Sequence, residues 1–175
     1  MEGVIAIIVI GVIVVAVSIF AIRFKRSLNS MMYDSRVVIE NAFAAAKDKL
    51  NEKTFVIAIH TTKSARTDIE NIVIQELKKL GAKILLLTNA EWKTLRSGDL
   101  AILKNDKAEL AIIGCVRQNF YDKDFFSFHK NEAEKPVLDF KVVNKDGEII
   151  HLDVVESFFE QLTARAAAAS IANAL

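Results

Sequence analysis

The segment from His60 to Thr67, HTTKSART, gathers side chains that could bind an anion. It follows an apolar run and leads into an expected helix, and the amino end of a helix binds phosphate through its free N–H groups. Lys63 and Arg66 add positive charge. The segment has no glycine that would let the backbone close around a phosphate, and it matches no P-loop or dinucleotide-binding pattern. We interpret it as a capped helix start, with a small-ligand or nucleotide site on His60, Lys63, Arg66 and Thr67 as the alternative.

Other catalytic or metal-binding patterns are missing from the sequence. The histidines His60, His129 and His151 are not spaced from one another, or from cysteine or carboxylate side chains, as metal ligands usually are. Ser64 lies near His60 but is not set in the glycine-flanked turn of a serine nucleophile. The single cysteine, Cys115, lies in an apolar run, as a small buried hydrophobic residue does. We therefore expect no enzymatic activity, no cofactor and no metal.

A polar segment rich in aromatic residues, NFYDKDFFSFHK, is a candidate for binding other proteins. Aromatic side chains are enriched at protein interfaces. The contact residues expected here are Phe120, Tyr121, Phe125 and Phe126. The alternative is that these rings fold back under the sheet, because large exposed apolar patches are uncommon.

The stretch VLDFKVVNKDGEIIHLDV predicts a β-hairpin. Its apolar residues share one side of the sheet if Val142 pairs with Ile150, which leaves a three-residue loop, 145–147. Such loops favour a left-handed residue before the second strand, and Gly147 occupies that position. The same pairing places Asp139 opposite Asp153, and Lys141 opposite His151.

These four polar residues form a second candidate partner-binding face. Facing carboxylates are unfavourable unless water or a cation separates them, and Lys141 could bridge them diagonally. A solvated face with local charge compensation is the alternative interpretation.

Several elements are needed to position these residues. Short apolar runs predict buried strands at 55–59, 82–88 and 109–116. Helical periodicity predicts helices over 36–50, 67–80 and 155–175, and a short one capped by Asn89. Thr67 and Glu70 form a capping-box pattern, and Gly81 is suited to end the helix. The expected fold class is α/β (α+β): a small mixed sheet with helices packed on it, ending in a β-hairpin and a helix.

The first part of the chain predicts a membrane anchor. Residues 3–22 carry no charge and are about as long as a bilayer core is thick. A cleaved signal peptide is the alternative, but no basic residue precedes the apolar run. Arg23, Lys25 and Arg26 follow it, which favours a cytoplasmic carboxyl side. We expect an anchor with its flank at 1–26, a connector at 27–36 and a soluble domain at 37–175.

The order of elements and two local patterns carry a resemblance to a known family. The strand Lys107-Ala108-Glu109-Leu110-Ala111-Ile112-Ile113-Gly114 and the turn Asp146-Gly147-Glu148-Ile149-Ile150 resemble those of a family of bacterial envelope proteins. It includes the curli-secretion channel protein, the lipoprotein activators of penicillin-binding proteins and the amino-terminal domain of the Tol-system propeller protein. The likeness spans residues 37–155. The sequence departs from the lipoprotein members in having no lipobox cysteine near its amino terminus. The resemblance implies a non-catalytic adaptor domain that acts outside the cytoplasm.

Together these features predict a docking module anchored in the inner membrane, with the bilayer and other envelope proteins as partners. The net charge of +1 argues against nucleic acid as a partner. A structural homo-oligomer is a further alternative. The flanking charges and the family resemblance disagree on the side of the membrane that the domain occupies, and the sequence leaves that choice open.

Overall fold

The computed structural model describes residues 2–62, 67–105, 108–119, 135–157 and 159–175. At 2–16, 19, 24, 27–29, 31–32, 118–119 and 135 it describes the backbone alone. The chain divides into two compact units, Met1–Val37 and Val38–Leu175.

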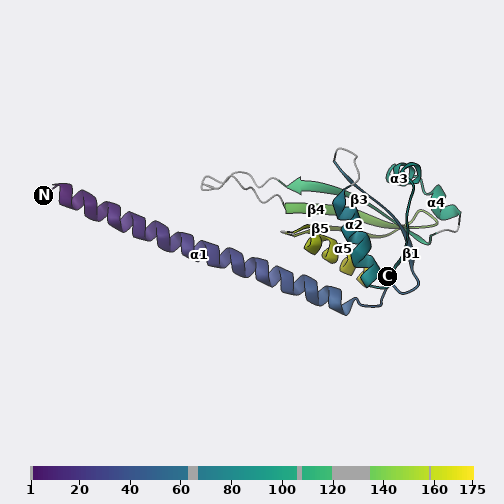
Figure 1. Cartoon of the computed structure of the whole chain (residues 1–175), viewed down its shortest axis with the longest axis horizontal. Helices are drawn as coiled ribbons and strands as arrows, with labels where there is room; N and C mark the ends of the chain where they lie inside the picture. Colours follow the sequence, from purple (N-terminus) through teal and green to yellow (C-terminus); the bar gives the residue numbers. More distant parts are fainter. Residues whose placement is uncertain (1, 63–66, 106–107, 120–134, 158) are drawn as a thin grey trace. The chain divides into compact units, whose positions relative to one another are not determined.

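One long helix, α1 (Glu2–Ala45), forms the first unit up to residue 37 (Figure 1). Residues 38–45 of the same helix belong to the second unit. Residues 27–36, expected as a connector, continue this helix. Within the part of the chain that was described, no helix combines the length and apolar character needed to cross a membrane. For most of the expected anchor, residues 3–22, the structure does not describe the side chains. The anchor therefore stays a prediction.

The second unit is built on a five-stranded mixed sheet with the strand order β2-β1-β3-β4-β5. The strands are β1 (Thr54–Thr61), β2 (Lys83–Leu85), β3 (Leu110–Asn119), β4 (Lys135–Asn144) and β5 (Ile149–Glu156). β1 runs parallel to both β2 and β3, while β3–β4 and β4–β5 are antiparallel. The α/β class with a mixed sheet and a terminal hairpin and helix is confirmed.

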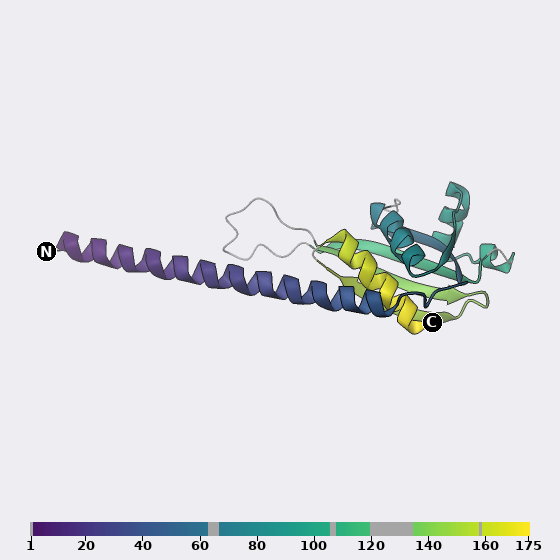
Figure 2. The same cartoon turned by 60° about the horizontal axis from the view of Figure 1, so that its bottom comes forward.

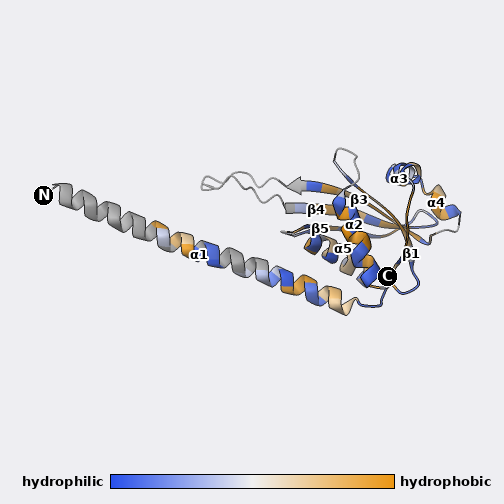
Figure 3. Ribbon diagram, in the orientation of Figure 1, coloured by the Kyte–Doolittle hydropathy of each residue, from blue (hydrophilic) through white to orange (hydrophobic). Residues whose placement is uncertain are grey.

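Helices cover both faces of the sheet (Figure 2). α2 (Asp68–Lys79) and α5 (Glu160–Ala174) pack on the face formed by Ile57, Ile112 and Phe140, which we call the α2/α5 face. On the opposite α3/α4 face, α3 (Asn89–Arg96) and α4 (Ala101–Lys104) pack over β1 and β3. The apolar colouring along β1 in Figure 3 reflects its burial between these layers. β1 and β3 are thus the most enclosed strands.

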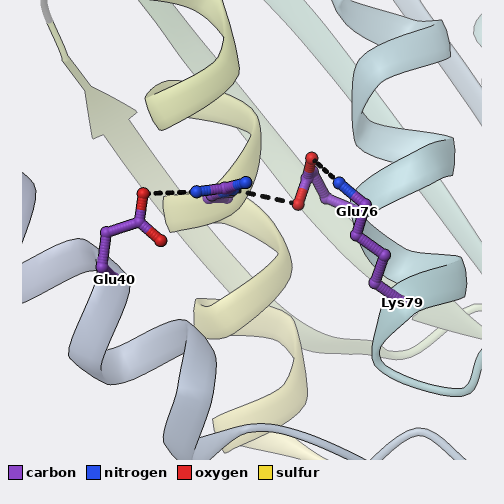
Figure 4. Close-up of polar contacts among 4 residues, drawn as sticks. Glu40, Glu76 and Lys79 are labelled. Carbon is purple, nitrogen blue, oxygen red and sulfur yellow. Dashed lines mark hydrogen bonds and ion pairs between the residues drawn. The ribbon is translucent and has the colours of Figure 1, made fainter.

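An ion-pair cluster joins three helices of the second unit. The Arg165 guanidinium contacts Glu40 of α1 and Glu76 of α2, with 3.2 Å between Arg165 Nε and Glu76 Oε2 (Figure 4). Lys79 Nζ lies 2.6 Å from the other oxygen of Glu76, whose side chain is 1% exposed. The Arg165 guanidinium also lies over the Phe43 ring. Because a buried carboxylate needs charged partners, this cluster holds the end of α1 against α2 and α5.

Three local predictions are wrong in detail. The strand expected at 82–88 is a three-residue edge strand, β2, with its side chains partly exposed. The short helix α3 is capped by Thr88 in a capping box with Glu91, because the chain turns one residue before Asn89. Thr67 does cap α2, but its hydroxyl accepts from Ile69 N, and the Glu70 side chain bonds elsewhere.

The predicted hairpin exists, and its turn is as expected. Gly147 has φ +85°, and its N–H donates to Asn144 O. The predicted pairing of Val142 with Ile150 is wrong: Val142 pairs with His151, and Val143 with Ile149. Ile150 is the extra residue of a β-bulge, which shifts the rest of β5 by one position. This shift turns Leu152 and Val154 away from the α2/α5 face.

Candidate functional site at the open end of the sheet

Two groups of predicted site residues fall outside the described part of the chain. Phe120, Tyr121, Phe125 and Phe126 lie in one such segment, and Lys63 and Arg66 in another. The aromatic-loop and anion-binding predictions therefore stay predictions. Of the anion-binding set, His60 and Thr67 are described. The His60 ring nitrogen Nδ1 lies 2.8 Å from Thr61 O, and Thr67 caps α2.

A buried carboxylate occupies the space between β1, α2 and α3. Glu70 Oε2 accepts from Ile59 N at 2.7 Å and from the Trp92 indole N–H at 2.6 Å. β2 pairs with β1 only as far as Val56, so Ile59 has no strand neighbour on this side. A buried N–H must find an acceptor, and Glu70 provides it. The role of Glu70 that these contacts support is structural.

The predicted face of Asp139, Lys141, His151 and Asp153 is divided between the two sides of the sheet. Asp139 pairs with Val154, and Lys141 with Leu152, on the α3/α4 face. His151 and Asp153 lie on the α2/α5 face, opposite Val142 and Phe140. The bulge at Ile150 causes this division, since it reverses the facing of every later residue in β5. The expected opposition of two aspartates does not occur.

Asp139 is instead paired with Arg117 of β3. Arg117 Nε lies 2.6 Å from Asp139 Oδ2, and Arg117 Nη2 lies 2.9 Å from Oδ1. The two bonds give the planar, two-point geometry that favours arginine over lysine at such sites. Both side chains are partly exposed, so the pair contributes modestly to stability.

Cys115 lies directly across from Asp139 in the β3–β4 ladder. Burial, followed by the negative charge of Asp139, raises the pKa of the Cys115 thiol, while the positive charge of Arg117 opposes that rise. A thiol with a raised pKa is a poor nucleophile near neutral pH. This environment supports the interpretation of Cys115 as a packing residue.

On the α2/α5 face, His151 and Asp153 meet Ser170 of α5. His151 Nε2 lies 2.8 Å from Ser170 Oγ, whose hydroxyl donates to Asp153. Because the hydroxyl proton is given to the carboxylate, His151 Nε2 must carry a proton and donate to the serine. A catalytic serine needs the opposite direction, with its proton passed to the histidine. The arrangement therefore acts as a polar bond between β5 and α5.

The same division leaves three apolar side chains on the outside of β5, and we call them the β5 edge patch: Ile149, Leu152 and Val154. Leu152 is 70% exposed, and Ile149 and Val154 are each 56% exposed. α3 and α4 pack over β1 and β3, short of this edge. An apolar cluster at a sheet edge is a feature of interaction surfaces.

Sequence reasoning missed this patch because it assigned the apolar residues of β5 to the core. A signal was present in α5, where Ser170 stands within an alanine-rich helix. A serine there can pair with the polar residues of β5, His151 and Asp153, and so favours the register that turns them inward. Within the described residues, no group of three His, Cys, Asp or Glu side chains could hold a metal ion.

Comparisons with known proteins assign no family to the chain. No protein-family profile matches the chain. No curated protein sequence matches it. One solved structure, a neuraminyllactose-binding hemagglutinin homolog from Helicobacter pylori, is similar at 15% identity with a TM-score of 0.28. The match covers 63% of this chain and 66% of that protein, just under two thirds of its length.

Proposed function

We propose that the chain is a membrane-anchored, non-catalytic docking module of a bacterial envelope-associated complex. The observation that carries this proposal is the β5 edge patch, where Leu152 is 70% exposed on the outermost strand of the sheet as described. Such residues are stabilised when a partner covers them, at about 25 cal/mol for each Å² of apolar surface removed from water. The module would recognise another protein through this edge.

The apolar run at 3–22 supports the membrane part of the proposal. It has the length of a bilayer-spanning helix, and the basic residues Arg23, Lys25 and Arg26 follow it. The expected location is the inner membrane, with a single pass. An anchor of this kind confines the domain to the bilayer surface and raises its local concentration near membrane partners.

The test is the native mass of the full chain extracted from membranes in a mild detergent. We expect wild type to migrate above the mass of a single chain. Replacing Leu152 and Val154 together by Ser should return it to that mass, since the replacement removes the exposed apolar contacts. Leu86→Ser is the matched control, because Leu86 is 77% exposed beside the opposite edge strand.

Two results would contradict the proposal. In one, wild type already migrates as a single chain. In the other, the Leu152→Ser, Val154→Ser variant keeps the mass of the wild-type assembly. Circular dichroism of each variant confirms that the fold is intact before masses are compared.

The aromatic segment provides a second, separate contact for the same function. Replacing Phe125 and Phe126 together by Ser should weaken partner capture and leave folding intact, because interface rings do not support the core. If this variant unfolds, the rings belong to the core and the segment is no interface.

A further inference from the structure

We draw no further inference here: the strongest candidate, the β5 edge patch of Ile149, Leu152 and Val154 on the outermost strand, belongs to the docking surface already proposed, and nothing in the described part of the chain shows what covers it.

Discussion

A single carboxylate replaces a missing stretch of strand in this fold. The sequence T-D-I-E predicts a capping box, but the Glu70 side chain turns inward and accepts from Ile59 N and the Trp92 indole. β2 is too short to form backbone hydrogen bonds with β1 along the full length of β1. Sequence patterns describe the helix start well, but they do not reveal that a neighbouring strand ends early. The need for an acceptor near Ile59 overrides the local preference.

Removing this acceptor should weaken the fold. We expect Glu70→Ala to lower the free energy of unfolding by about 3 kcal/mol, because it leaves two buried donors unsatisfied. Glu70→Gln keeps an oxygen acceptor and should cost about 1 kcal/mol, from loss of the charge-assisted bonds. Trp92 is the only tryptophan, so its emission follows denaturant unfolding directly. Glu109→Gln, at an exposed position, is the control, and a Glu70→Ala variant as stable as this control would rule out the role.

Burial is the main cause of the raised pKa of the Cys115 thiol, and the neighbouring charges should modulate it further. Asp139 raises the pKa of the thiol, so Asp139→Asn should lower that pKa and increase the thiolate fraction at a given pH. Arg117 lowers the pKa, so Arg117→Gln should have the opposite effect. We expect iodoacetamide to react several-fold faster with Asp139→Asn than with wild type near neutral pH. The measurement is the alkylation rate as a function of pH, and identical profiles in all three proteins would refute the electrostatic account.

The hairpin shows where prediction from sequence succeeds and where it fails. Turn chemistry is local, so Gly147 and the three-residue loop were predicted correctly. The register depends on which side chains can pack against the neighbouring helix. In α5, Ser170 forms hydrogen bonds with His151 and Asp153. A bulge at Ile150 is a small local change, but it exchanges the two faces of β5. The candidate site predicted on Asp139, Lys141, His151 and Asp153 was therefore split, while its position near the sheet edge was retained.

The contact of the end of α1, residues 38–45, with α2 and α5 depends on Arg165. Burial acts to lower the pKa of Arg165, but the hydrogen bond to Glu40 and the charge of Glu76 raise it above its ordinary value. We expect Arg165→Ala to lower the free energy of unfolding by about 3 kcal/mol, because it removes one of the charged partners of the buried Glu76. Glu40 is 35% exposed, so Glu40→Ala should cost about 1 kcal/mol at most.

Hydrogen exchange tests whether the cluster around Arg165 holds the end of α1 in place. Both variants should speed amide exchange over residues 38–45, where α1 belongs to the second unit, and Lys79→Ala should not. Lys79 is half exposed and touches Glu76 alone in this cluster. Unchanged exchange over 38–45 in Arg165→Ala would show that the cluster does not hold the helix.

At the scale of the whole chain, the order of helices and strands followed from hydrophobic periodicity, because each buried run is continuous in sequence. Phe55–Ile59 and Leu110–Val116 are central strands, as predicted from their apolar runs. The strand predicted at 82–88 lies at an edge, since local hydrophobicity does not reveal how many neighbours a strand has. The membrane anchor and its orientation depend on the lipid environment and remain predictions from the sequence.

A reporter fused after Leu175 tests the orientation. The basic residues Arg23, Lys25 and Arg26 predict a cytoplasmic carboxyl terminus. We expect a green fluorescent protein fusion to fluoresce and a β-lactamase fusion to give no ampicillin resistance. The reverse result would place the domain outside the cytoplasm, as the family resemblance implies. A fusion after residue 2 is the matched control and should show the opposite behaviour.

The unequal lengths of the two outer strands limit how far assembly can proceed. β5 has eight residues and β2 has three, so any strand addition would use the β5 edge alone. Growth by further strand addition would then stop at two chains, and fibres would not form. Lengthening β2 by design would remove this stop, and the protein would be expected to polymerise.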